Sequence, residues 1–224
     1  IGSTSIKAVK LKKSPQGIEL TEAAVVSIPK NPEVAKSAEA IRQLLEPWGA
    51  AQVPIVTAVG GPDTALRSVL LPKMTPSELQ SALSYELEKY IPFKIEETWV
   101  DHVIVGERPG GRIEVLLVGA KRDLIEKHLS ILDAAGIKPV CIDLEALALS
   151  HAWEFNCPPD ESGISCFLYM GAPETILLFF KGKQLQLTRE IPIGGDAFTR
   201  AIAETLQLDD AKAETLKWGQ QAQV

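Results

Sequence analysis

Hydrophobic and polar positions change their period several times in the first 60 residues, and each period predicts a different element. Residues 6–11 alternate apolar and basic side chains, which is typical of a half-buried strand. The segment around Pro15 and Gly17 is a good turn between this strand and a second apolar run. A helical spacing then ends at Gly49, and a short β-branched run follows it. The expected elements are strands at 5–11, 18–28 and 55–59 and a helix at 32–48.

Residues 67–145 show a second rhythm, in the order strand, helix, strand, strand, helix, strand. The first helix has a clear start, because Thr75 can cap it, Pro76 fits its first turn and Glu78 completes a capping box. This helix must end before Pro92. The order predicts one compact α+β module whose two helices cover one face of its sheet. The expected elements are strands at 67–71, 99–105, 113–118 and 140–144 and helices at 77–90 and 122–135.

The last third of the chain returns to strands followed by helices. The polar segment 156–163, which contains Pro158 and Pro159, predicts a linker. Three strands then lead through Gly194 and Gly195 into a helix. Two three-stranded units on either side of a different module indicate duplicated halves with an insertion. The expected elements are a helix at 146–154, strands at 164–170, 176–180 and 185–190, a helix at 197–205 and another helix beginning near 209.

Composition narrows the class of protein. The 224 residues are 46% apolar and 23% charged, as in an ordinary globular protein, and the net charge of −6 gives no basic surface for nucleic acid. The three cysteines lack metal-binding spacing and predict a reducing compartment, with Cys141 and Cys166 as small core residues. The three histidines are scattered and no nucleophile elbow occurs, so neither a metal site nor a catalytic triad is expected. No run of 18 apolar residues is present.

The first candidate for chemistry is the turn formed by Gly2, Ser3, Thr4 and Ser5, just before the first strand. Backbone amides and hydroxyls of such a turn can approach a phosphate, because no bulky Cβ is in the way. Lys7 could place a cation on the same anion. An ordinary turn rich in Ser and Thr explains the same residues, so the turn alone leaves both interpretations open.

This turn resembles the first phosphate loop of the actin, hexokinase and Hsp70 ATPase superfamily. The Asp of that loop would precede Ile1, so we expect the natural protein to begin earlier. Further segments are similar to the PilM family of actin-like type IV pilus assembly proteins, and this similarity extends from Ile1 to about Gly219. The segments that carry it are 70–74 with 87–97, 132–149 and 188–203.

The resemblance to PilM implies an α/β protein with the actin-like ATPase (ribonuclease H-like) fold and an inserted α+β SHS2 module, also called 1C. Residues 1–66 with the helix at 146–155 would form subdomain 1A, and residues 67–145 would form the SHS2 module. Residues 163–224 would begin subdomain 2A. The C-terminal part of the fold, with an adenine-binding glycine segment, would follow Val224.

The resemblance also implies ATP and Mg²⁺ between the two halves of the fold. One departure changes this expectation, because Tyr169 stands where the family has Asp, and Pro173 and Glu174 replace hydroxyl residues. A phenol cannot orient Mg²⁺ as a carboxylate does, proline lacks an N–H donor, and a glutamate repels phosphate. We therefore expect no ATP hydrolysis and assign no catalytic residue. The implied nucleotide-binding residues are Gly2, Ser3, Thr4, Ser5, Lys7, Gly171, Gly194 and Gly195.

A second candidate site lies at the end of the helix predicted at 77–90, where three apolar side chains precede a carboxylate. The plain alternative is that one or two of these apolar residues belong to the core. The resemblance implies that a groove here, between subdomain 1A and the SHS2 module, binds the short cytoplasmic tail of the membrane protein PilN. Trp48 and Trp99 are predicted to be core residues. The expected partner-binding residues are Tyr90, Ile91, Phe93 and Glu96.

By this resemblance the chain is expected to be a cytoplasmic scaffold of the type IV pilus assembly platform. It would lie at the inner membrane through its PilN-like partner and contact other platform proteins. Three alternatives share the fold. The cytoplasmic domain of a GspL-like type II secretion protein would carry a transmembrane helix after this segment. An FtsA-like ATPase would form filaments, and an active sugar kinase of the superfamily would need the Asp that Tyr169 replaces.

Overall fold

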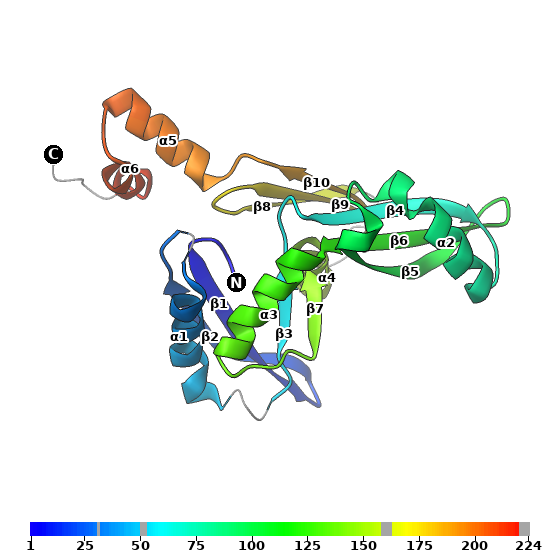
Figure 1. Cartoon of the computed structure of the whole chain (residues 1–224), viewed down its shortest axis with the longest axis horizontal. Coiled ribbons are helices and arrows are strands. Elements are labelled where there is room, and N and C mark those ends of the chain that lie inside the picture. The colour runs from blue at the N-terminus through cyan, green and yellow to red at the C-terminus, as the bar shows by residue number, and fades with distance from the viewer. Residues whose placement is uncertain (31, 50–52, 158–162, 220–224) are drawn as a thin grey trace. The chain divides into compact units, whose positions relative to one another are not determined.

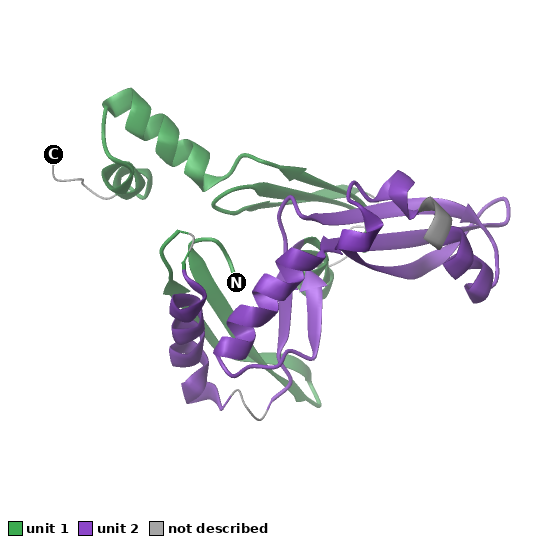
Figure 2. Cartoon of the chain, in the orientation of Figure 1, with its two compact units in different colours: residues 1–32, 146–224 green, residues 33–145 purple. Residues whose placement is uncertain are grey.

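The structure of the protein is a computed structural model that describes residues 1–30, 32–49, 53–157 and 163–219 (Figure 1). The chain divides into two compact units, which Figure 2 shows in different colours. Unit 1 comprises residues 1–32 and 146–224, and unit 2 comprises residues 33–145. Most of the predicted linker at 156–163 falls outside the described residues.

Unit 1 begins with the predicted hairpin, which is confirmed. Strands β1 (Ser5–Ser14) and β2 (Gly17–Ser27) pair antiparallel, and a bulge interrupts their register between Lys10 and Leu11. Gly17 has a φ of 132° at the turn, a conformation that only glycine adopts easily. After β2 the amide of Ile28 donates to the carbonyl of Thr4 at 2.9 Å, which ties the end of the hairpin to its beginning.

The second sheet of unit 1 has the antiparallel order β10-β9-β8. Its strands are β8 (Ile164–Met170), β9 (Thr175–Lys181) and β10 (Gln184–Ile191). One face buries Ile176, Leu178 and Phe180 of the central strand. Trp153 of helix α4 (Glu145–Asn156) stacks on Phe180, with ring centroids 5.6 Å apart, so α4 packs on this face. Helices α5 (Gly195–Leu206) and α6 (Asp210–Lys217) follow the sheet.

Unit 2 begins with helix α1 (Val34–Leu45), which is shorter than the predicted helix at 32–48. A 3₁₀ turn, Glu46–Trp48, follows it and ends at Gly49, which has a φ of 64°. Pro47 lacks the amide that a further α-helical turn needs, which explains the change of helix type. Helix α3 (Arg122–Ala134) packs against α1, and beside them the short strands β3 (Val56–Val59) and β7 (Cys141–Leu144) pair parallel.

The second sheet of unit 2 has the antiparallel order β4-β6-β5. Its strands are β4 (Thr64–Pro72), β5 (Thr98–Arg108) and β6 (Arg112–Lys121). Helix α2 (Pro76–Tyr90) begins with the predicted capping box between Thr75 and Glu78. It covers one face of the sheet and forms the core of this part of the chain. The core residues are Ala65, Val69, Leu71, Leu79, Leu83, Ile91, Ile113, Val115 and Leu117.

The prediction that one sheet carries all four strands of the module at 67–145 is wrong. The last strand, β7, pairs with β3 instead, because α3 packs against α1 and returns the chain to that side. Cys141 and Cys166 are exposed, so the prediction that they are core residues is also wrong. Cys141 is the first residue of the short strand β7, and Cys166 shares the exposed face of edge strand β8 with Ile164 and Leu168. The boundaries predicted for the inserted module remain a prediction, although unit 2 also ends at Glu145.

Candidate functional site

The first predicted phosphate-binding segment is a closed turn in unit 1. The amide of Gly2 donates to the carbonyl of Ser5 at 3.0 Å. A Cβ on Gly2 would lie 2.9 Å from that carbonyl oxygen, so the turn requires glycine. Ser3 is exposed, whereas Thr4 and Ser5 are half-buried. The turn is therefore a rigid start to β1 that leaves the Ser3 side chain toward solvent.

The predicted glycines of the second half come together in the same unit. The amide of Gly171 donates to the carbonyl of Glu174 at 2.8 Å and closes the turn between β8 and β9. The amide of Gly195 donates to Gly171 at 2.9 Å, and the amide of Asp196 donates to Ala172 at 2.8 Å. These two amides at the start of α5 are the kind that bind phosphate in other proteins, but here they bind the turn.

Gly194 makes this close approach possible. A Cβ at this position would lie 2.6 Å from three backbone atoms, which are the oxygens of Gly171 and Ala172 and the nitrogen of Glu174. No side chain fits there without moving backbone. We use the name glycine-loop region for residues 2–7, 169–175 and 194–196 together.

The cationic side chains of the glycine-loop region also have protein partners. The ammonium of Lys7 lies 5.7 Å from the centre of the Tyr169 ring, so the predicted phosphate lysine faces the residue that replaces the family's Asp. Lys30 pairs with Asp196 in the first turn of α5 at 2.9 Å. The hydrogen bond that Lys30 donates to the Asp196 carboxylate raises the pKa of Lys30 above its ordinary value.

The sequence did not predict a polar cluster that joins α5 to α6. The Lys217 ammonium donates to Glu214 at 2.7 Å, to Thr199 at 3.0 Å and to the carbonyl of Gly195 at 3.2 Å. Burial raises the pKa of Glu214, but hydrogen bonds from Lys217, Thr199 and Trp218 outweigh this and hold it at about 2. The spacing of Glu214 and Lys217 on α6 was the only available signal, and such pairs are common on helix surfaces.

Two groups that the family's phosphate loop would offer to Mg²⁺ and a nucleotide are absent at residues 169–175. The position that would carry an oxygen ligand holds the half-buried phenol of Tyr169, and Pro173 has no N–H to donate. Within the described residues, no three His, Cys, Asp or Glu side chains gather closely enough to hold a metal ion. The polar groups of the glycine-loop region instead join β1, the β8–β9 turn and α5 to one another.

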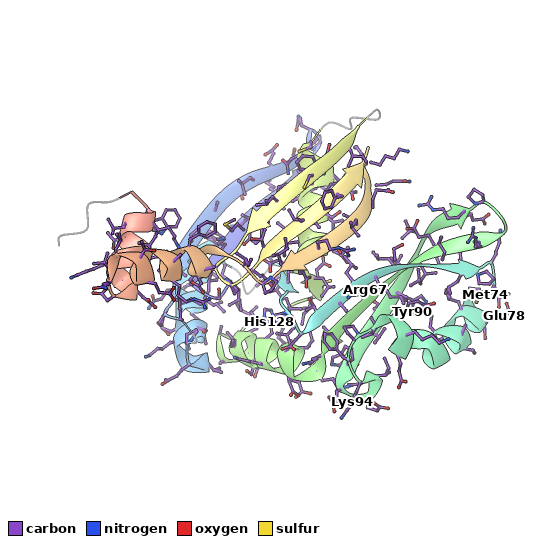
Figure 3. All side chains as sticks on the ribbon, turned by 90° about the horizontal axis from the view of Figure 1, so that it is seen from above. Arg67, Met74, Glu78, Tyr90, Lys94 and His128 are labelled. Carbon is purple, nitrogen blue, oxygen red and sulfur yellow. The ribbon has the colours of Figure 1, made fainter. Side chains whose placement is uncertain are left out.

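The second predicted site lies in unit 2, in the connection between α2 and β5 (residues 91–97). Figure 3 shows Tyr90 and Lys94 at this end of α2, and Met74 and Glu78 at its beginning. Ile91 is only 1% exposed and belongs to the core, so the expectation that it contacts a partner is corrected. Tyr90 and Phe93 are half-buried and pack against that core.

The rim of this connection is charged and carries an exposed aromatic ring. The Lys121 ammonium lies 5.1 Å from the centre of the Phe93 ring, and it pairs with Asp63 at 2.6 Å. Trp99 is 54% exposed, so the prediction that it is a core residue is wrong. Its ring lies 4.1 Å from the Arg122 guanidinium, which donates to the Glu96 carbonyl at 2.9 Å. The Glu96 side chain is exposed.

The strand–helix order of both units and the likeness to solved structures reported below show an α/β protein of the actin-like ATPase fold, as predicted. A family model described as type IV pilus assembly protein PilM matches residues 1–223. The chain therefore belongs to the PilM family, which confirms the resemblance noted in the sequence.

Solved structures agree with this assignment. The PilM-PilN type IV pilus biogenesis complex contains a chain that is 27% identical, with a TM-score of 0.85; the match covers 96% of this chain and 67% of that one. The cytoplasmic domain of EpsL, an inner membrane component of the type II secretion system of Vibrio cholerae, is 18% identical, with a TM-score of 0.55 and coverage of 93% and 73%.

The ethanolamine utilization protein EutJ from Carboxydothermus hydrogenoformans is 12% identical, with a TM-score of 0.52 and coverage of 96% and 58%. At these identities EpsL and EutJ show a shared fold alone.

Proposed function

We propose that this protein is a scaffold of type IV pilus assembly that binds the N-terminal tail of a PilN-like membrane protein. The observation that carries the proposal is the likeness to the PilM-PilN complex over nearly the whole chain. Among the described residues, no helix has both the length and the apolar character that crossing a membrane requires. In this proposal the protein works at the cytoplasmic side of the inner membrane, where the tail of its partner would hold it.

We place the binding surface at the connection between α2 and β5. Tyr90 and Phe93 are apolar and half-buried, so a partner side chain can complete their burial. Glu96 offers an exposed carboxylate beside them. Partly buried aromatic groups with a charged rim are typical of the centres of protein interfaces. The surface therefore suits a short peptide with an apolar anchor and a basic residue.

The same proposal assigns no ATP turnover to the protein. The amides of Gly171, Gly195 and Asp196 bind other groups of the protein, and Tyr169 stands where the resemblance implies a metal-orienting carboxylate. In this proposal the fold serves as a scaffold, and the free energy of binding comes from contacts between the tail and the α2–β5 connection.

Calorimetry with a synthetic peptide of the cognate tail tests the proposal. Ordering a flexible tail costs free energy, so we expect a Kd on the order of micromolar. Phe93→Ala should weaken binding by about tenfold, because an interface anchor contributes about 1.4 kcal/mol or more. Phe155→Ala is the matched control, since Phe155 is 62% exposed on α4 in the other unit.

Two results would contradict the proposal in different ways. If no cognate tail binds the wild-type protein, the adaptor function is wrong. If Phe93→Ala retains the wild-type melting temperature and the wild-type affinity, the tail binds at another surface. Because Phe93 also packs against the core, the melting temperature of each variant must be measured alongside its affinity.

A further inference from the structure

Strand β5 is an edge strand with an unusual composition. It pairs with β6 on one side, and in the described part of the chain no other strand lies beside it. Its side chains Val103, Ile104 and Val105 are between 45% and 55% exposed. The unpaired N–H and C=O groups of such an edge are a template for another strand, and proteins usually protect them.

Two common forms of edge protection, basic side chains and proline, are missing from most of β5 and present on the other edge of the same sheet. Charged residues, especially lysine, and proline are the common means of blocking an edge. Strand β4 contains Arg67 and ends at Pro72. Strand β5 has neither Lys, Arg nor Pro from Thr98 to Gly106, and a bulge interrupts it only after Ile104. β5, which carries Asp101 and this bulge, is therefore the less protected of the two edges of this sheet.

From these observations we propose that β5 binds the partner tail as an added strand of the β4-β6-β5 sheet, an inference that rests on the proposed function. Peptide segments bind sheet edges in this way in many proteins, with main-chain hydrogen bonds for affinity and alternate side chains for specificity. β5 begins one residue after the α2–β5 connection ends. A tail whose apolar anchor contacts Phe93 is thus led directly along β5.

The open face of the sheet gives the added strand a place for its side chains. Helix α2 covers one face, and the other face carries Trp99, Val103, Leu116 and Val118, which are exposed or half-buried. Every second residue of an added strand would lie over this face. Trp99 is already fixed by Arg122, so its ring loses little conformational freedom on binding.

Charge favours a basic peptide over a second copy of the chain. The exposed carboxylates of Glu96 and Asp101 lie at the beginning of β5, and the Asp101 carboxylate accepts a hydrogen bond from the His102 amide at 2.8 Å. Pairing two copies through β5 would bring two chains of net charge −6 together. A tail with a basic residue is complementary to the same surface.

Hydrogen exchange on the complete protein, with and without the synthetic tail peptide, tests the proposal. We expect amides of β5 to exchange at least tenfold more slowly when the peptide is bound, with β4 unchanged. A second measurement uses peptides that are N-methylated at one backbone position at a time. In an added strand, only every second residue directs its amide to β5. Methylation of those amides should weaken binding at least tenfold, whereas methylation of the amides between them should weaken it much less.

Paired proline variants give a third readout. Of Val103→Pro and Ile104→Pro, one removes an amide that bonds to β6 and the other removes an outward amide. The variant with the higher melting temperature has lost the outward amide, and it should lose at least tenfold in peptide affinity. Val69→Pro and Leu70→Pro on β4 are the matched controls, and the more stable of these two should bind as the wild type does.

The outcomes separate this inference from the proposed function. If no cognate tail binds the wild-type protein, both fall. If the tail binds without slowing exchange in β5 and without the alternating effect of methylation, the added strand is wrong and the scaffold function stands. If β5 is protected in the absence of peptide and the protein is a dimer by light scattering, the edge pairs with a second copy and the inference is overturned.

Discussion

The glycine-loop region of unit 1 and the α2–β5 region of unit 2 differ in what their functional groups contact. In the first, the amides of Gly195 and Asp196 and the ammonium of Lys7 meet other parts of the protein. In the second, Trp99 and the apolar run of β5 are exposed to water. A satisfied group contributes to folding, whereas an exposed apolar group can still lower the free energy of a complex. In our proposal the first region therefore serves stability and the second serves recognition.

The glycine-loop region holds its own elements together. The amides of Gly195 and Asp196 at the start of α5 donate to the carbonyls of Gly171 and Ala172 in the β8–β9 turn, and each such bond has a net value of about 1 kcal/mol. These bonds hold β8, β9 and α5 in place without a ligand.

The largest expected effect is that of Gly194→Ala in the glycine-loop region. The new Cβ would lie 2.6 Å from three backbone atoms, so backbone must move, and we expect a loss of about 3 kcal/mol or more of unfolding free energy. Urea unfolding followed by tryptophan fluorescence measures it, because Trp153 stacks on Phe180 in the same unit.

Gly106→Ala is the control for this variant, since no atom lies within 4 Å of its Cβ position. We expect it to change stability by no more than about 0.5 kcal/mol. A Gly194→Ala protein as stable as this control would mean that the β8–β9 turn does not pack on the start of α5.

The next effect concerns acid stability in unit 2. His128 of α3, marked in Figure 3, is only 7% exposed, and its Nε2 lies 2.9 Å from the Thr57 hydroxyl of β3. Burial lowers its pKa to about 4 from an ordinary 6.5. Between pH 6.5 and about 4 the unfolded chain binds a proton at His128 and the folded protein does not. The free energy of unfolding is therefore highest above pH 6.5 and decreases as the pH falls to about 4. The loss is at most about 3 kcal/mol.

His128→Gln keeps a hydrogen-bonding group for Thr57 and removes the titration. We expect unfolding free energy to depend less on pH between 6.5 and 4 in this variant than in the wild type. His102→Gln, which removes an exposed imidazole from β5, is the control. Equal slopes for the wild type and His128→Gln would show that His128 accepts a proton without cost to the fold.

A smaller effect is expected at the start of α2, which supports the proposed binding surface. The Thr75 hydroxyl accepts a hydrogen bond from the Glu78 amide at 3.3 Å, and the Glu78 carboxylate accepts one from the Thr75 amide at 2.7 Å. Thr75→Ala should cost about 1 kcal/mol, whereas Thr75→Ser, which keeps the hydroxyl, should cost much less. Thermal unfolding compares the two, and an equal cost would show that the cap does not stabilise α2.

Local signals allowed much of this fold to be predicted. The capping box and Pro76 located the start of α2, and the Pro15–Gly17 turn located the β1–β2 hairpin. These features depend on residues within one turn of one another, so the sequence shows them directly. The bulge at Lys10 was not predicted, because it depends on the pairing of two strands.

Contacts between distant segments were harder to predict. The pairing of β7 with β3 follows from where α3 packs, and parallel strands carry no turn between them as a signal. Phe93 and Ile91 look alike in the sequence, yet only the structure shows that Ile91 is in the core. The exposure of Trp99 likewise depends on which face of the sheet α2 covers. The contact between Lys7 and Tyr169 joins two residues that are far apart in the sequence, so no local signal predicted it.

The smallest expected effect is that of nucleotide on the wild-type protein. We expect about 1 mM Mg-ATP to leave the melting temperature unchanged, whereas a ligand present at 100 times its Kd stabilises by about 2.7 kcal/mol. Phosphate release should stay at background, and turnover of about 1 s⁻¹ would contradict this expectation. The Lys7–Tyr169 contact itself contributes about 0.5–1 kcal/mol at most, because Lys7 is exposed.

Substitution of Tyr169 sharpens this last prediction. Tyr169→Phe retains the ring under Lys7 and should respond to Mg-ATP as the wild type does. Tyr169→Asp introduces a carboxylate that could orient a metal ion, and it releases Lys7 from the ring. The bonds between the β8–β9 turn and the start of α5 stay in place in this variant. We therefore expect Mg-ATP to stabilise Tyr169→Asp by less than about 1 kcal/mol, and stabilisation near 2.7 kcal/mol would show that Tyr169 alone excludes the nucleotide.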